Sequence, residues 1–160
     1  MFRIRFLTPA LLDGQGSPLA GAELLLGTDR VRFLADLRYW GIGEYERQWR
    51  EGISRLVHGG VASALVTAYG GPDPDASHRM WGLWRDADHV YAQELTVLAS
   101  ELDAPFDPSA PWPHVGEHVP AAEQGLSILE LRCDLLPLLA AWFFPTLPWP
   151  WAGGWGNAAA

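Results

Sequence analysis

The alternation of apolar and polar residues predicts β-strands in the first part of the chain. Residues 2–7 read FRIRFL, in which Phe and Ile alternate with Arg, and a period of two is typical of a half-buried strand. Two further strands are predicted for residues 22–27 and 31–37, around a turn that contains Gly27 and Asp29. Residues 8–21 carry Pro, Gly and Ser and predict a loop.

One amphipathic helix is predicted for about residues 43–58. Its apolar face is formed by Ile42, Tyr45, Trp49, Ile53 and Leu56, which follow the helical period. Acidic residues occupy the first turns, where the helix dipole favours negative charge, and a Gly-Gly pair follows the last periodic residue. We therefore interpret the aromatic cluster of Trp40, Tyr45 and Trp49 as core that holds the helix on a sheet.

The second half of the chain predicts more strands. Residues 61–69 form a strand with small side chains on one face, residues 80–98 form a hairpin, and residues 126–133 form a last strand. Residues 103–120 are rich in proline and predict an extended segment. Together these elements predict a single α+β domain over residues 1–132, with an antiparallel sheet packed against one main helix.

Residues 133–160 have a different composition, being apolar, rich in Trp and interrupted by four prolines. A transmembrane helix needs ~20 consecutive apolar residues, and the uninterrupted runs here are far shorter. This tail packs on the domain, binds a partner, or is an aberrant extension; the sequence does not choose among these.

Composition and charge narrow the class of protein. The chain has 160 residues, 49% apolar and 19% charged, which is typical of one globular domain. A net charge of -8 argues against nucleic-acid binding, because phosphate groups require a basic surface. The single Cys133 excludes an internal disulfide, and the N-terminal apolar runs are too short for a signal peptide, so we expect a cytoplasmic protein.

The negative charge is concentrated in residues 70–125. This segment holds ten acidic residues and two arginines, so it carries the entire net charge of -8. Such a surface can attract a basic partner, although a solvated acidic surface with no partner explains it equally well. The predicted partner-binding residues are Asp73, Asp75, Asp86, Asp88, Glu94, Glu101 and Asp103.

No residue pattern predicts catalysis, a metal or a cofactor. His114 and His118 are four residues apart, but flanking prolines and Gly116 oppose the helix that this metal spacing requires. Asp86 and Asp88 could form an acid–base pair, yet Asp is common in hairpin turns for backbone reasons. We therefore expect no enzyme, while two alternatives stay open: a small enzyme whose site assembles only in three dimensions, and an interaction module that uses the apolar tail.

An ordered set of short motifs over about residues 31–130 resembles a known family, the immunity proteins of contact-dependent growth inhibition systems. The matching positions before and on the helix are Asp36, Tyr39, Trp40, Tyr45, Gln48 and Trp49. The later ones are Ser63 to Thr67, Trp81, Val90, Tyr91, Gln93, Pro105, Phe106, Asp107 and Pro108. The chain departs from the family after the extended segment and in its last strand.

The resemblance implies a cytoplasmic protein that binds and neutralises a cognate toxin domain, often a nuclease. Toxin-contact residues differ between immunity proteins, so none are transferred to this chain. The acidic residues named above remain the predicted contact residues, on the ground of charge alone.

Overall fold

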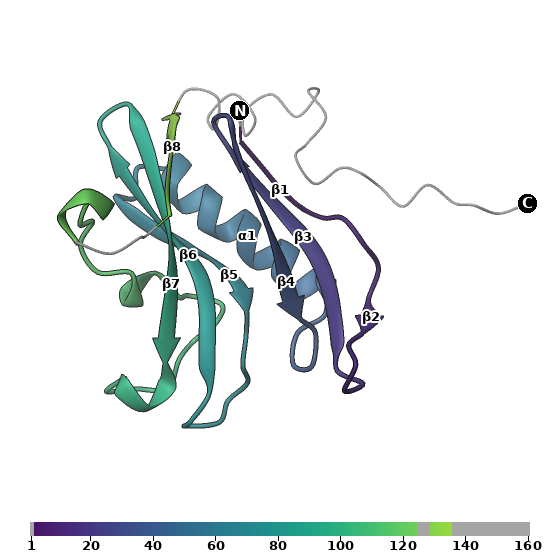
Figure 1. Cartoon of the computed structure of the whole chain (residues 1–160). Helices are drawn as coiled ribbons and strands as arrows, with labels where there is room; N and C mark the ends of the chain where they lie inside the picture. The colour runs from purple at the N-terminus through teal and green to yellow at the C-terminus, as the bar shows by residue number, and fades with distance from the viewer. Residues whose placement is uncertain (1, 125–128, 136–160) are drawn as a thin grey trace, which may run out of the picture.

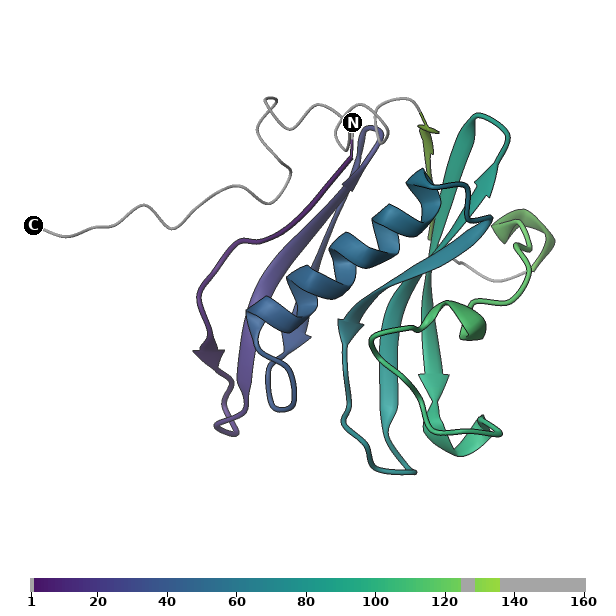
Figure 2. The same ribbon diagram turned by 180° about the vertical axis from the view of Figure 1, so that it is seen from behind.

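The computed structural model describes residues 2–124 and 129–135. Two four-stranded antiparallel sheets lie side by side, and one α-helix lies behind them (Figure 1). Seen from behind, this helix crosses in front of the space between the two sheets (Figure 2). The architecture confirms the predicted α+β class, but the strands form two sheets instead of one.

The first sheet, here called sheet A, is built around one long central strand. Strand β3 (Pro18–Leu26) pairs with β4 (Asp29–Asp36) along one edge and with β1 (Phe2–Phe6) and β2 (Leu11–Leu12) along the other. The predicted loop over residues 8–21 was wrong in part. It contains β2 and the first residues of β3, because cross-strand pairing of Leu11 with Leu19 overrides the local turn signals.

The second sheet, sheet B, contains four sequential strands. They are β5 (Ala62–Ala68), β6 (Ser77–Asp86), β7 (His89–Leu98) and β8 (Glu130–Asp134), in that spatial order. The hairpin of β6 and β7 confirms the predicted one, with Ala87 in the left-handed region at its turn. Of the predicted last strand, residues 126–128 lie outside the described residues, and β8 confirms the remainder.

Helix α1 (Ile42–Val57) confirms the predicted helix and its apolar face. The backbone N–H of Gly41 donates to the Glu44 carboxylate at 3.0 Å, which satisfies a free donor before the first turn. Tyr45 and Trp49 are fully buried, and Trp40 packs against the same cluster. The aromatic cluster is therefore core, as predicted.

The helix covers the free edge of strand β5 with its side chains. The Gln48 amide donates to the carbonyl of Ala64 at 2.9 Å, and the Trp49 indole donates to the carbonyl of Val66 at 2.7 Å. A Cβ added at Gly52 would lie 2.5 Å from the oxygen of Ala64, so only glycine allows this approach. The helix thus meets the backbone of β5, whereas the Ala64 side chain lies in a second apolar cluster.

Both sheets and the helix share one main core. Its largest fully buried members include Ile4 and Leu24 from sheet A, Trp49 from α1, and Trp81 and Leu83 from sheet B. A second cluster forms where Met80 and Trp84 pack against Val115 of the segment that follows β7. That segment contains three short 3₁₀ helices, Ala99–Glu101, Trp112–His114 and Ala121–Glu123.

The boundary predicted between the domain and the tail falls inside β8. Cys133 is 4% exposed and Leu135 is 5% exposed, and the Leu135 N–H donates to the carbonyl of Asp88 at 2.7 Å. The remainder of the predicted tail, residues 136–160, lies outside the described residues. Within the described ranges, no helix has the length and hydropathy needed to cross a membrane.

Candidate functional site

The seven acidic residues predicted to bind a partner do not form one patch. Asp86 and Asp88 lie at the β6–β7 turn, whereas Asp73 and Asp75 precede β6 at the far end of sheet B. A strand of ten residues spans about 33 Å, so the two groups are well separated. All seven side chains are exposed.

Four of these acids lie on the two connections at one end of sheet B. The pairing of Ser77 with Leu98 brings the β5–β6 connection beside the segment that follows β7. Asp73 and Asp75 lie on the first connection, and Glu101 and Asp103 lie on the second. We call this group of four the acidic end.

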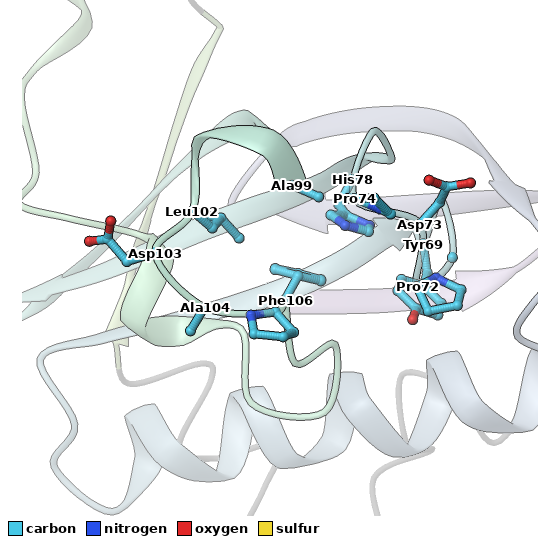
Figure 3. Close-up of a pocket in the computed structure, with 12 residues that line it drawn as sticks. Tyr69, Pro72, Asp73, Pro74, His78, Ala99, Leu102, Asp103, Ala104 and Phe106 are labelled. Atoms are coloured by element: carbon cyan, nitrogen blue, oxygen red, sulfur yellow. The ribbon is translucent and has the colours of Figure 1, made fainter.

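A pocket of about 300 Å³ opens at the acidic end. In the close-up, Asp73 and Asp103 lie at opposite ends of the pocket, with Phe106 and Ala104 between them (Figure 3). Its lining residues are Tyr69, Gly71, Pro72, Asp73, Pro74, His78, Ala99, Leu102, Asp103, Ala104, Pro105 and Phe106. The walls are thus mainly apolar and aromatic, and the charge lies at the two ends.

His78 lies inside an aromatic stack that forms part of the pocket. Its ring stacks on Phe106 at a centroid distance of 4.1 Å and on Tyr69 at 5.3 Å. The backbone N–H of Gly70 donates to His78 Nδ1 at 3.2 Å, which places the proton of the neutral ring on Nε2. His78 is fully buried, and its Nε2 atom has no hydrogen-bond partner in the described part of the chain.

The electrostatic state of the pocket follows from this burial. Burial lowers the pKa of His78, and the neighbouring His114 lowers it further, so the ring is neutral near pH 7. The carboxylates of Asp73 and Asp103 are then the charges that an incoming group meets. A neutral aromatic wall beside carboxylates favours a cationic group, which is attracted by both.

A tight loop fixes the position of Tyr69 beside the pocket. Gly71 has a φ of 98°, and a Cβ at this position would lie 2.4 Å from the ring of Tyr39. Glycine is therefore required by both backbone conformation and space. The Tyr69 N–H donates to the hydroxyl of Tyr45 at 3.0 Å, and that hydroxyl donates to the carbonyl of Asp36 at 2.6 Å.

The other polar groups considered in the sequence have structural partners. His118 bonds to Glu130 at 2.8 Å and lies in a network with Gln93, so it joins β7 and β8 to the preceding segment. The Ser63 hydroxyl donates to the carbonyl of Gly52 at 2.7 Å. In residues 2–124 and 129–135, no three His, Cys, Asp or Glu side chains are grouped to hold a metal ion.

Comparison with known proteins identifies the family of the chain. Residues 35–140 match the family model of the CdiI N-terminal domain, which is more than half of the sequence. The chain belongs to this family. The resemblance to immunity proteins of contact-dependent growth inhibition, inferred from the motifs of residues 31–130, is thereby confirmed.

The fold of this CdiI-family chain is also found in a solved structure. It is similar to a chain of the CdiA-CT/CdiI toxin and immunity complex from Enterobacter cloacae, with a TM-score of 0.74 and 21% identity. The alignment covers 87% of this chain and 94% of the other chain. A search of curated protein sequences finds no match.

No sequence pattern indicated that these residues form one pocket. Phe106 was one of the family-like positions and Tyr69 ended a predicted strand, but His78 stood in a loop-like stretch with no neighbouring motif. The stack depends on contacts between segments about thirty residues apart, which single-sequence patterns do not reveal. The helix residues Tyr45, Gln48 and Trp49 of the resemblance prove to be structural.

Proposed function

We propose that this chain acts in the cytoplasm as an immunity protein, binding and neutralising a cognate, basic toxin domain without catalysing a reaction. The family assignment supports an immunity role, and the toxin-immunity complex of Enterobacter cloacae provides a structural precedent for such a partner. A nuclease is the kind of basic toxin that suits an acidic inhibitor, because nucleases must bind phosphate groups.

The observation that carries the proposal is the position of Asp73 and Asp103 at the two ends of one aromatic pocket (Figure 3). Protein interfaces depend on a few side chains that enter well-formed pockets. A volume of about 300 Å³ accommodates one long side chain. We propose that an Arg or Lys side chain of the toxin enters here, with its charge at one end of the pocket, beside the carboxylate of Asp73 or of Asp103.

The lining of the pocket favours binding over catalysis. It contains no Ser, Cys or Lys, the side chains that most often act as nucleophiles. Its imidazole is buried with a lowered pKa, and Nδ1 is already occupied by the Gly70 N–H. A general base must reach the proton that it removes, and this ring does not have a free basic nitrogen.

The distant acids Asp86 and Asp88 provide an internal comparison. They carry the same charge as Asp73 and Asp103 but lie at the opposite end of sheet B, and neither of them lines the pocket. Long-range attraction depends on net charge, whereas close contact depends on position. We therefore propose the acidic end as the contact and the remaining predicted acids, Glu94 included, as contributors to long-range attraction.

Growth protection tests the proposed function. The proposed cognate toxin domain is produced in cells together with either the native chain or the double variant D73N/D103N. We expect the native chain to restore growth and the variant to restore it less, while D86N/D88N protects almost as well as the native chain. If both double variants protect as well as the native chain, the proposed contact is contradicted. If the folded native chain itself gives no protection, the immunity role is contradicted.

A further inference from the structure

The outer face of sheet A carries an array of four arginines around one buried carboxylate. Glu23 lies on the central strand, 1% exposed, with Arg5 and Arg32 as its direct cross-strand partners. Arg3 and Arg30 occupy the next positions on the same face, on either side of Leu25. The distance from the guanidinium group to the Glu23 carboxylate is 3.6 Å for Arg3, 3.5 Å for Arg5, 3.4 Å for Arg30 and 3.9 Å for Arg32.

One carboxylate does not satisfy four guanidinium groups. Each guanidinium has five N–H donors, whereas a carboxylate offers about four lone-pair positions. The Nε atoms of Arg3 and Arg5 and the Oε1 atom of Glu23 are buried without a hydrogen-bond partner among the described residues, although they lie in one cluster of ion pairs. The array has a net charge of +3 on a chain whose net charge is -8.

The array is open to solvent. The side chains of Arg30 and Arg32 are 54% and 70% exposed. Those of Arg3 and Arg5 are 26% and 38% exposed. Glu23 thus holds the four groups together on one side of the sheet, while the exposed guanidinium groups of Arg30 and Arg32 remain available to an external acceptor.

Exposed leucines continue the same face beyond the arginines. Leu34 follows Arg30 and Arg32 at the strand period of two and is 54% exposed. Leu7 follows Arg3 and Arg5 at the same period and is 38% exposed. Leu11, which is 56% exposed, pairs with Leu19 on the same side of the sheet.

We infer that this outer face of sheet A is a second interaction surface. It binds an acidic segment of a partner protein whose apolar side chains pack on the exposed leucines. Guanidinium groups pair with carboxylates in a fixed, two-pronged geometry. Protein interfaces are enriched in Arg and contain an apolar part, which the leucines supply. Phosphate backbones would use the arginines but not the leucines, and the net charge of -8 repels long polyanions.

This inference is independent of toxin binding. The acidic end lies on sheet B and attracts cations, whereas the arginine array lies on sheet A and attracts anions. A partner bound by the array therefore differs in charge from the proposed toxin. The chain has two surfaces of opposite charge on its two sheets, which allows two different partners to be bound.

Fluorescence anisotropy with three labelled probes tests the inference on the full chain. The probes are a short peptide of alternating Glu and Leu, the same peptide with Gln in place of Glu, and a single-stranded oligothymidylate. We expect the Glu–Leu peptide to bind and the other two probes to bind much more weakly. Either no binding of the Glu–Leu peptide, or equal binding of the oligonucleotide, would overturn the inference.

Two substitutions and a matched control locate the binding. Arg32→Glu should weaken binding of the Glu–Leu peptide by about tenfold or more, and Leu34→Ser should weaken it several-fold. Arg47→Glu is the control, because Arg47 is 64% exposed, similar to Arg32, but lies on α1. Arg32→Gln replaces Arg32→Glu if the latter does not fold. An equal effect of the Arg32 and Arg47 substitutions, or no effect of Leu34→Ser, would contradict the inferred surface.

Discussion

Gln48 on α1 and Val66 on β5 are joined by a hydrogen bond in which the Gln48 Oε1 atom accepts the backbone N–H of Val66 at 2.9 Å. The same amide donates to the carbonyl of Ala64, so one side chain satisfies both a donor and an acceptor of an edge strand. Trp49 adds a third bond, to the carbonyl of Val66. Helix α1 thus replaces the neighbouring strand that β5 lacks and protects an edge that would otherwise pair with another chain.

Replacing Gln48 by Leu should lower the free energy of unfolding by about 2–4 kcal/mol, because two buried backbone groups lose their partners. Leu has a similar volume, so the loss reports hydrogen bonding and not packing. Urea unfolding measures it, with Arg47→Leu on the exposed side of the same helix as the control, expected within about 0.5 kcal/mol of the parent. Equal stability of the two variants would show that the edge of β5 does not need this side chain.

Trp49 should contribute through its ring and its indole N–H together. Trp49→Ala should cost about 3–5 kcal/mol, and Trp49→Phe should cost less because the ring fills most of the space. The stacking on Phe6 at 4.9 Å would persist in the Phe variant, while the bond to Val66 would not. Growth protection should fall only with the folded fraction. A Trp49→Ala protein with native melting temperature and no protection would instead assign Trp49 to a binding site.

The end of the folded domain can be located by two truncations. A chain of residues 1–135 keeps the buried Cys133 and Leu135 and all of β8. A chain of residues 1–132 removes both side chains and should be less stable by about 2–4 kcal/mol, since a buried leucine contributes ~1.5–3 kcal/mol and the smaller buried cysteine adds less. Thermal melting by circular dichroism compares them. Identical melting temperatures would show that residues 133–135 do not complete the core.

Acid should weaken the junction of β7, β8 and the segment before β8. Burial alone would raise the pKa of Glu130, but hydrogen bonds from His118, Gln93 and the Ala121 N–H outweigh it, and the pKa is lowered from 4.5. The stabilising contribution of this lowered pKa is therefore complete above about pH 4.5 and is lost as the pH falls through the folded-state pKa. As the pH is lowered below 4.5, the free energy of unfolding should fall less steeply in the Glu130→Gln variant than in the parent protein. Parallel curves for the two proteins would exclude this contribution.

Local patterns predicted the elements well where one period dominated. The face of α1 from Tyr45 to Leu56 and the hairpin around Ala87 follow directly from spacing and turn residues. The first residues of β3 were missed because Pro18 and Gly21 resemble a loop, and only pairing with β2 and β4 makes them a strand. Periodicity alone does not identify which strands pair, so one sheet was predicted where the structure has two.

The functional surfaces were less predictable because they depend on three-dimensional proximity. Counting charges along the chain located the acidic segment, but it did not show that the acidic residues are divided between the two ends of sheet B. The four arginines alternate visibly along β1 and β4, yet their common centre at Glu23 follows only from strand register. His78 had no sequence signal, because its stack with Phe106 joins residues from different segments.

The central claim is that the acidic end of sheet B makes the toxin contact, and stopped-flow association with the proposed cognate toxin domain tests it most directly. Rates are measured across a salt series, since salt screens charges beyond a Debye length of about 10 Å at 0.1 M. We predict that both D73N/D103N and D86N/D88N reduce the on-rate similarly, because each removes two charges. Only D73N/D103N should also raise the dissociation rate, by about tenfold or more. An on-rate independent of salt, or a dissociation rate that both pairs change equally, would contradict the proposed contact.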